Sequence, residues 1–448
     1  MAWSYLPHTA EDRQEMLSAI GVKETMDLFA DIPEQIRLRR GLNLPGPLSE
    51  PELAAHFAKL AAANANLAEY ACFLGAGAYD HHIPSTVDHV LRRSEFYTAY
   101  TQYQPEISQG YLQALWEYQS MICALTGMPV ANASMYDGAT AMTEAAILAC
   151  GATNRREILV ARSVHPHYRS VLATYARDFD YDVKEIAFAD GATSASELAA
   201  LAGRSTAAVI VQNPNFFGSV EDLAGLVAAT HAVGALFITV AEPTALGVLE
   251  APGKLGSDMV VGEGQPLGLA LAFGGPYLGF FAASAKLMRK MPGRIVGQTV
   301  DKDGKRGFVL TLQAREQHIR REKANSNICS NEALCALAIS VYLATMGKEG
   351  FAEVSRQCLQ KAHYAYDRIV AAGAAQPVFA APFFQEFAVR PGKPIAEINA
   401  SLLEQKIIGG LDLEEFYPEL AGCMLLCVTE KRTKAEIDAL AAGLEALL

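Results

Sequence analysis

A chain of 448 residues is long enough to bury a substantial hydrophobic core, and this length is typical of two or three domains. Hydrophobic residues make up 51% of the sequence, a high share that favours an extensive subunit interface in addition to the core. The formal net charge of -12 argues against nucleic-acid binding, because neutralising phosphates requires a basic surface.

The eight cysteines are scattered, with no CxxC pair and no Cys/His pair at zinc-finger spacing. This usage is typical of reduced, mostly buried thiols in a cytoplasmic protein. Cys423 and Cys427 lie on one side of a predicted strand, where core packing is favoured over a redox or metal role. The sequence shows no signal-peptide or transit-peptide pattern and no uninterrupted membrane-spanning stretch, so we expect a cytoplasmic protein without a membrane segment.

The first 70 residues predict a helical segment. Asp12 is expected to cap a helix that ends near Gly21, a loop rich in Pro, Gly and Ser covers residues 43–51, and an alanine-rich helix runs from Pro51 to about Tyr70. Helical N-terminal segments of this kind more often wrap a partner subunit than take part in catalysis.

Residues 73–119 are rich in Gly, Tyr, His, Gln and Glu and lack a periodic apolar face until a helix begins near Ser108. Irregular polar and aromatic loops in an apolar protein tend to line a site, because a buried loop must satisfy its backbone groups. A metal site at His81 and His82 is disfavoured, since adjacent histidines do not easily face one ion and no third ligand stands at a diagnostic spacing. We therefore expect no metal.

From about Gly110 to Gly279, predicted helices alternate with short β-branched runs. This alternation predicts an α/β fold with a mostly parallel sheet covered on both faces, whose ligands bind at the carboxyl ends of the strands. The predicted helices span 140–149, 194–202 and 220–233. The predicted strands span 158–161, 183–187, 207–212, 236–240 and 259–261, with an edge strand at 278–282.

Residues 258–279 have the pattern of an active-site strand and loop, with a short β-type run, a glycine-rich crossing and the turn Gly274-Gly275-Pro276. Chains that build a pyridoxal-phosphate site on such a sheet usually place a lysine shortly before this turn. No lysine occurs between Gly256 and Ala285, and Gln265 occupies roughly the expected position. The pattern predicts a pocket that has kept its frame and lost its nucleophile.

A polar motif, Asp137-Gly138-Ala139-Thr140, stands directly before a predicted helix. The free N–H groups at such a helix start suit a phosphate or a carboxylate, and an ordinary helix N-cap is the simpler interpretation. The sequence leaves both open.

A second polar motif concentrates five basic residues within nine positions of an acidic protein. Arginine forks bind carboxylates and phosphates, whereas a solvated helix with pairing from Glu316 to Arg320 is the alternative. The amides and hydroxyl at residues 325–327 favour the anion site slightly. The basic residues are Arg315, His318, Arg320, Arg321 and Lys323.

The remainder of the chain predicts a smaller α+β domain. Residues 286–313 form a charged loop or hairpin, and an apolar helix then ends at Gly347. Two strands at 386–389 and 424–428 precede a last amphipathic helix, which begins at the capping-box pair Thr433 and Glu436. We thus divide the chain into a helical segment (1–70), a large α/β domain with a degenerate cofactor site (71–325) and a small α+β domain (326–448).

Three stretches give the chain a family resemblance: FYTAYTQYQPEISQG (96–110), NASMYDGATAMTEA (132–145) and LQAREQHIRREKANSNIC (312–329). Over essentially its whole length the sequence resembles the glycine cleavage system P-protein, in particular the N-terminal half that is a separate α subunit in many bacteria. The resemblance implies a pyridoxal-phosphate-dependent transferase fold of the aspartate aminotransferase type. It also implies that the cofactor lysine belongs to the β subunit, and residues 239–242 lack the aspartate that would pair with the cofactor's pyridine nitrogen.

The activity implied by this resemblance is that of an oxidoreductase, glycine dehydrogenase (decarboxylating). Together with the β subunit, the chain would decarboxylate glycine and pass the aminomethyl group to the lipoyl arm of H-protein, and it would be inactive alone. The implied partners are the β subunit in an α2β2 assembly, which carries the pyridoxal phosphate, and lipoylated H-protein. Two alternatives stay open: a non-catalytic scaffold that stabilises β and recruits H-protein, and an independent lyase or aminotransferase of the same fold.

The site residues are carried over by motif, and no catalytic residue is expected in this chain alone. Family members commonly read TPYQ at residues 101–104, and the missing proline makes this loop less rigid. Asp137, Gly138, Ala139 and Thr140 would be a remnant phosphate loop. The predicted walls facing the β-subunit cofactor are Tyr97, Tyr100, Thr101, Tyr103, Gln104 and Glu106, and the residues predicted for anionic groups are Arg315, His318, Arg320, Asn325, Ser326 and Asn327.

Overall fold

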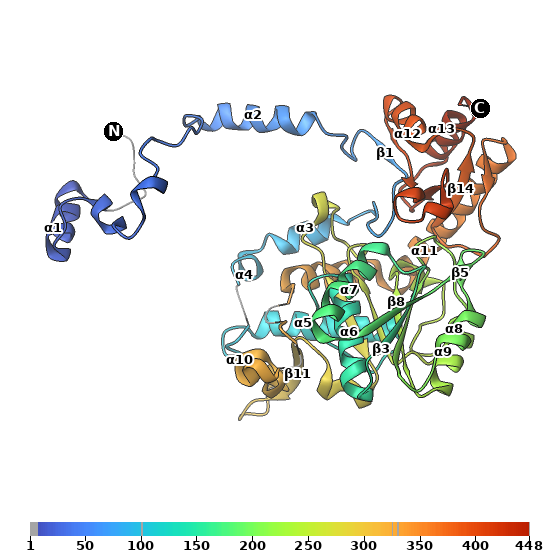
Figure 1. Cartoon of the computed structure of the whole chain (residues 1–448), viewed down its shortest axis with the longest axis horizontal. Helices are drawn as coiled ribbons and strands as arrows, with labels where there is room; N and C mark the ends of the chain where they lie inside the picture. The colour runs from blue at the N-terminus through green and yellow to red at the C-terminus, as the bar shows by residue number, and fades with distance from the viewer. Residues whose placement is uncertain (1–7, 100–101, 325, 329–330, 448) are drawn as a thin grey trace. The chain divides into compact units, whose positions relative to one another are not determined.

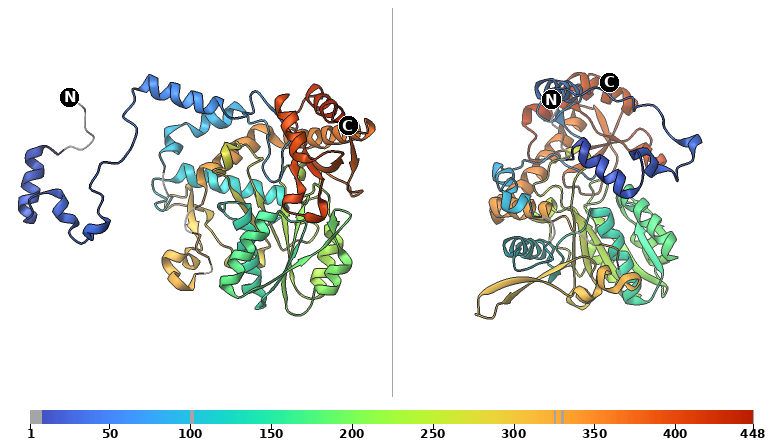
Figure 2. Two further views of the ribbon diagram at one scale, coloured as in Figure 1. Left: turned by 45° about the horizontal axis from the view of Figure 1, so that its top comes forward. Right: turned by 90° about the vertical axis from the view of Figure 1, so that its left-hand side faces the viewer.

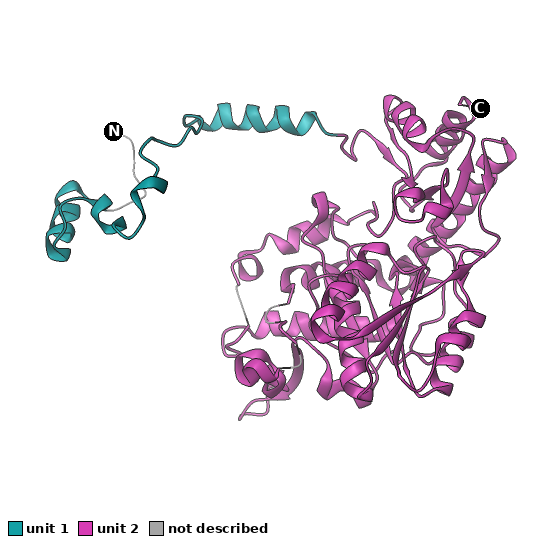
Figure 3. Cartoon of the chain, in the orientation of Figure 1, with its two compact units in different colours: residues 1–64 teal, residues 65–448 magenta. Residues whose placement is uncertain are grey.

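The computed structural model describes residues 8–99, 102–324, 326–328 and 331–447 (Figure 1). The chain divides into two compact units, residues 1–64 and residues 65–448 (Figure 3). The predicted boundaries inside the second unit, after residues 70 and 325, stay predictions.

The first unit contains two helices, α1 (Ala10–Ile20) and α2 (Glu50–Ala62), with the 3-10 turns η1 (Thr25–Phe29) and η2 (Glu34–Ile36) between them. Thr9 rather than Asp12 caps α1: the Asp12 amide donates to the Thr9 hydroxyl, and the Asp12 carboxylate accepts the Thr9 amide at 2.8 Å. The predicted cap was wrong because both members of a capping box are polar. Gly21 ends α1 in the left-handed conformation, and α2 ends before the predicted Tyr70.

A seven-stranded sheet forms the centre of the second unit, in the order β2-β10-β9-β8-β7-β3-β4. Strands β4, β3, β7, β8 and β9 run parallel, while β10 is antiparallel to both its neighbours. The α/β prediction is confirmed. The strands are β2 (Val130–Ala131), β3 (Glu157–Ala161), β4 (Asp182–Ile186), β7 (Thr206–Asn213), β8 (Leu236–Ala241), β9 (Met259–Glu263) and β10 (Gly279–Ala283).

Strand β10 is not the edge strand that the sequence predicts. Its far side pairs with β2, through Ala282 with Ala131 and Ala283 with Val130. A strand of two residues has no alternation to detect, so β2 was missed.

Helices cover both faces of this sheet. Alternate residues of β9 show it: Met259 and Val261 pack into one core with α6 (Gly138–Thr153), whereas Val260 packs into another with α5 (Gln109–Thr126). The first core also takes in α7 (Pro166–Phe179), α8 (Ala195–Leu201) and α9 (Leu223–Ala232). Two buried faces explain why the strands read as continuous apolar runs.

Helix α11 (Ala333–Ala371) connects this layer to the C-terminal part of the unit. The predicted helix end at Gly347 is confirmed: Gly347 is non-helical (φ 61, ψ 179), and α11 consists of two helical segments that meet there at a kink. Near the start of the helix, Ile339 packs beside the large sheet. Near its end, Ile369 packs into the C-terminal core. Among the described residues, α11 is the one helix long and apolar enough to cross a membrane, and its buried face is that of a core helix.

The C-terminal sheet has the order β13-β14-β17-β16 and carries two helices on it. Thr433 and Glu436 form the predicted capping box at the start of the last helix. The predicted hairpin is present as β11 and β12, which project from the unit (Figure 2). The bounds are β11 (Ile295–Val300), β12 (Arg306–Thr311), β13 (Ala375–Pro377), β14 (Glu386–Pro391), β16 (Leu411–Asp412), β17 (Met424–Cys427), α12 (Ile395–Glu404) and α13 (Lys434–Glu445).

Candidate functional site

Gln265, where a lysine is expected, follows β9 and is 1% exposed. Its amide nitrogen donates to the carbonyls of Tyr79 (3.0 Å) and Leu269 (2.8 Å), and its amide oxygen accepts the Tyr79 N–H at 2.9 Å. The side chain is therefore fully engaged with backbone groups. Gln265 anchors the loop around Tyr79 and offers no nucleophile.

The predicted remnant phosphate loop is the start of α6. Asp137 caps the helix, since its carboxylate accepts the Thr140 N–H at 2.7 Å. The Gly138 N–H donates to the carboxylate of Glu263 at 3.0 Å. Glu263 also accepts the N–H groups of Gln265 and Leu278, each at 3.1 Å. An internal carboxylate thus occupies the anion position at this helix start.

The cavity beside this loop is small. It lies at the carboxyl end of β8 and has a volume of about 30 Å³, which is room for about one or two water molecules. The His165 and Tyr168 rings stack with their centroids 4.8 Å apart, and a Cβ at Gly138 would overlap the Tyr168 hydroxyl. Burial lowers the pKa of His165 to about 4, so this imidazole is neutral.

Glu242 ends the stretch 239–242, which lacks the aspartate expected for the cofactor's pyridine nitrogen, and it lines the same cavity. It is buried, and it turns back onto its own chain to accept the N–H groups of Thr244 (3.0 Å) and Ala245 (2.7 Å). With a carboxylate at the phosphate position, no lysine and a cavity of about 30 Å³, these residues do not fit pyridoxal phosphate.

A second place brings the other motifs together. The Tyr103 ring lies 6.3 Å from the His318 ring in a T-shaped arrangement, so the stretches 96–110 and 312–329 meet. The Arg294 guanidinium stacks 4.6 Å from the Tyr103 ring centroid. Arg294 also donates to the Asn331 side chain at 3.4 Å, and Asn331 in turn donates to the Ala133 carbonyl at 2.8 Å. Parts of all three family-like stretches thus surround Arg294.

The basic motif is not one helix. It forms the short turns η6 (Gln313–Arg315), α10 (Gln317–Arg320) and η7 (Arg321–Lys323). Glu316 is buried and lies 3.6 Å from the His318 ring nitrogen. The alternative of a solvated helix with pairing from Glu316 to Arg320 is therefore not formed. Arg315 is partly buried and donates to the Met291 carbonyl.

The remaining predicted residues divide by exposure. Ser326 donates to Glu144 at 2.8 Å, and burial raises the pKa of Glu144 to about 7. Tyr100, Thr101 and Asn325 lie outside the described residues. The sequence analysis missed Arg294, which stands in no recognisable motif, and Glu263, which lies in the active-site-like stretch 258–279 but was not singled out there. Side chains exposed to solvent belong to Tyr97, Tyr103, Gln104, Glu106, His318, Arg320 and Asn327.

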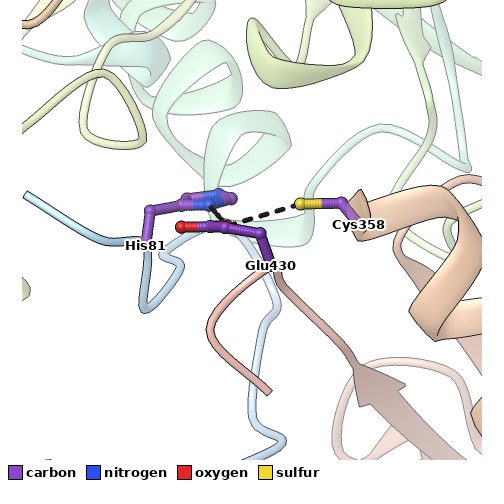
Figure 4. Close-up of side chains that lie close together, drawn as sticks. All are labelled: His81, Cys358 and Glu430. Atoms are coloured by element: carbon purple, nitrogen blue, oxygen red, sulfur yellow. Dashed lines mark hydrogen bonds and ion pairs between the residues drawn. The ribbon is translucent and has the colours of Figure 1, made fainter. Parts of the chain in front are cut away.

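One cluster of His, Cys and Glu lies beside the small cavity, since the His81 ring is 6.2 Å from the ring of Tyr79, which lines it (Figure 4). His81 Nδ1 and Cys358 Sγ both approach one carboxylate oxygen of Glu430, at 2.6 and 3.5 Å. Two ligands of one tetrahedral zinc lie about 3.3 Å apart, so the 2.6 Å contact is that of a hydrogen bond. Burial raises the pKa of Glu430, but the hydrogen bond and charge of His81 outweigh it and hold the pKa at about 2.

Comparison with known proteins decides the family. Residues 3–444 match the family described as Glycine cleavage system P-protein. The chain belongs to this P-protein family. It is 57% identical over all 448 residues to the probable glycine dehydrogenase (decarboxylating) subunit 1 of Brevibacillus brevis, of which it covers 99%. The subunit 1 of Moorella thermoacetica is 56% identical, with 99% of this chain and 100% of that protein covered.

Solved structures agree with this assignment. A crystal structure of glycine decarboxylase (P-protein) of the glycine cleavage system, in inhibitor-bound form, matches with a TM-score of 0.90 and 43% identity over the full length of both chains. A sphingosine-1-phosphate lyase of Burkholderia pseudomallei matches with a TM-score of 0.65 at 14% identity, over 92% of this chain and 93% of that one. This second likeness shows the fold alone. The P-protein family member described here thus has the fold of pyridoxal-phosphate-dependent enzymes.

Proposed function

We propose that the chain is the lysine-free subunit of a glycine dehydrogenase (decarboxylating) and acts only together with a partner subunit. Family membership and the name subunit 1 of its full-length relatives support this function. With its partner it decarboxylates glycine and transfers the aminomethyl group to the lipoyl arm of H-protein. The buried thiols among the described cysteines suit the cytoplasm.

The observation that carries the proposal is the state of the chain's own pocket. Gln265 is locked to the backbone, and Glu263 fills the anion position at the start of α6. A subunit in this condition serves catalysis from outside the cofactor site. Pyridoxal phosphate is therefore carried by the partner subunit in an α2β2 assembly.

The chain contributes the walls of that site. Tyr103, Gln104, Glu106 and His318 are exposed on neighbouring loops, so they are accessible to a partner. An aromatic and polar surface of this kind orients a small polar substrate and excludes water, while the bound cofactor supplies the electron sink for decarboxylation. Tyr97 and Arg320 extend the same exposed set.

The test mixes this chain with its subunit 2 and lipoylated H-protein. We expect glycine-dependent exchange of carbon dioxide only when all three are present. Borohydride reduction in the presence of pyridoxal phosphate should attach no cofactor to the chain alone. Lys254 and Lys286, the lysines nearest in sequence to Gln265, already pair with Glu250 at 2.9 Å and Asp258 at 2.7 Å. Stoichiometric trapping on either lysine would refute the proposal.

A scaffold that only stabilises the partner and recruits H-protein is the second candidate. It is favoured by the first unit, where Leu17 is the one buried residue among those described and many apolar side chains are exposed. Glu106→Gln and Tyr103→Phe separate the two functions in the reconstituted complex. Normal turnover with normal assembly would support the scaffold, whereas lost turnover with normal assembly supports the enzyme subunit.

A further inference from the structure

Arg294 is a buried cation whose hydrogen-bonding capacity is largely unused. Its residue is 2% exposed, and its Nε and Nη2 atoms have no hydrogen-bond partner in the described part of the chain. Only Nη1 has an acceptor, the Asn331 side chain at 3.4 Å. A guanidinium carries five N–H donors, so most of this one is unsatisfied.

Such an arrangement is unfavourable unless an anion is supplied. Buried charges are normally paired, because removing a charge from water costs several kcal/mol that a neutral amide does not return. The Tyr103 ring, 4.6 Å away, stacks on the face of the guanidinium and leaves the N–H groups at its edge unpaired. Within the described ranges, no carboxylate lies within ion-pair distance of Arg294.

The backbone fixes this side chain in place. Gly293 has a φ of +71°, and a Cβ there would lie 2.9 Å from the Asn132 side chain. The Arg294 carbonyl accepts the Ala133 N–H at 2.8 Å. The backbone of Arg294 is thus held in place by the loop at Asn132 and Ala133, which belongs to one of the three family-like stretches.

Arg315, a partly buried arginine nearby, also has unpartnered N–H groups, and these have a local explanation. Its Nε and Nη2 atoms also lack partners, but they share a cavity of about 10 Å³ with Glu316, whose Oε1 atom is unpartnered too. A space of that size has room for about one water molecule, which can bridge the two opposite charges. Arg294 has no such acidic neighbour, so its partner comes from outside the described chain.

We propose that Arg294 binds an oxyanion, a phosphate or a carboxylate, which approaches on the side of Tyr103 in the assembled enzyme. This inference rests on the proposed function and names a residue for it. The two sources of such a group in that enzyme are the phosphate of the partner-borne cofactor and the carboxylate of glycine. Arginine suits both, because its planar fork matches two oxygens of one anion.

The experiment compares Arg294→Gln and Arg294→Lys with Arg289→Gln, an exposed arginine on the preceding 3-10 turn. In the complex with subunit 2, the apparent Kd for pyridoxal phosphate and the KM for glycine are measured. We expect Arg294→Gln to raise one of them about 10- to 100-fold, Arg294→Lys to raise it less, and Arg289→Gln to change neither. A rise in Kd assigns the phosphate, and a rise in KM alone assigns the carboxylate.

Unchanged Kd and KM, or a defect confined to subunit assembly, would overturn the proposal. Thermal unfolding of the full-length chain alone, with inorganic phosphate, acetate or chloride at equal ionic strength, provides a readout that needs no activity. Phosphate or acetate should raise the Tm of the wild type and of Arg289→Gln, and should not raise that of Arg294→Gln. If the wild-type complex decarboxylates no glycine, the proposed function fails. The Tm measurements with phosphate and acetate then still test whether Arg294 binds an anion.

Discussion

Glu263 is a side chain that fills the anion position at the start of α6. Its carboxylate accepts three backbone N–H groups, from Gly138, Gln265 and Leu278, and the residue is partly buried. Burial raises the pKa of Glu263 to about 7, which means that holding the charged carboxylate at this site costs free energy. That cost is offset because a helix start and a loop lose their unsatisfied donors.

Replacing Glu263 by alanine should expose the anion site that the carboxylate now fills. The free energy of unfolding should fall by about 2–4 kcal/mol, because three N–H groups lose their acceptor. Millimolar phosphate should restore part of the loss, since the Gly138 N–H again finds an anion. Urea unfolding with and without phosphate measures both effects. Glu322→Ala, at an exposed position, is the control; equal losses in the two variants would contradict the assignment.

The pair of Glu430 and His81 should give the chain a defined acid sensitivity. The pKa of Glu430 lies at about 2 in the folded chain against an ordinary value of 4.5, so its contribution is present above pH 4.5 and is lost as the pH falls through about 2. This lowering corresponds to about 3 kcal/mol at neutral pH. Glu430→Gln should lose that amount at neutral pH, and the difference from wild type should shrink on acidification.

Denaturant unfolding over a pH series measures this difference. Glu445→Gln, at an exposed carboxyl, should stay close to the wild type throughout. A difference for Glu430→Gln that is constant down to the lowest measurable pH would show that His81 does not stabilise the carboxylate.

At the scale of elements, α11 joins the two layers of the second unit through a break at Gly347. The backbone there has φ 61 and ψ 179, a conformation that an L-residue adopts only with strain. No atom lies within 4 Å of a Cβ placed at Gly347, so the glycine is required by its backbone and not by crowding.

Gly347→Ala should therefore lower the free energy of unfolding by about 1–3 kcal/mol. Gly350→Ala is the matched control in the same helix, where an added Cβ makes ordinary contacts at 3.5 Å and the backbone is helical. This second change should stabilise the chain by up to about 1 kcal/mol, because alanine loses less conformational freedom. Urea unfolding of the two variants gives the signs, and a stabilising Gly347→Ala would disprove the strain.

The elements were predictable from the sequence to the extent that their patterns are local. The sequences of β7 and β8 are long apolar runs, so both strands were predicted. The capping box at Thr433 predicted the start of α13. The glycine at position 347 correctly marked the end of the first helical segment of α11, whereas strand β2 has two residues and no period. A local sequence pattern also does not show whether a strand such as β10 lies at the edge of the sheet or pairs on both sides.

The candidate site was predictable in part for the same reason. The absence of a lysine near Gln265 is visible in the sequence, and the stretches around Tyr103 and His318 were expected to act together. The contact of Glu263 with Gly138 joins positions 125 residues apart, and Arg294 is an ordinary residue in its own segment. The contacts that single out Glu263 and Arg294 form only when the chain folds, so a local sequence pattern does not reveal them.

At the scale of the whole molecule, the first unit presents an unusually apolar surface. Isolated soluble chains rarely expose so many large side chains in one short segment, and such surfaces mark protein interfaces. The relatives' name, subunit 1, points to a partner that covers it. The exposed side chains are Met16, Ile20, Met26, Leu28, Phe29, Ile32, Ile36, Leu38, Leu42, Leu44, Leu48, Leu53, Phe57 and Leu60.

Helix α2 offers the sharpest test of this surface. Leu53, Phe57 and Leu60 are spaced i, i+4 and i+7, so they form one stripe, and they are 45, 61 and 51% exposed. Changing all three to serine should leave the Tm of the free chain almost unchanged, because they are not part of its core. Association with subunit 2 should weaken at least about 10-fold, since three anchoring side chains lose their burial. Sedimentation or native mass spectrometry of the mixture measures it, with Lys59→Ser on the same helix as control. Association of wild-type strength would mean that the partner does not bind this stripe.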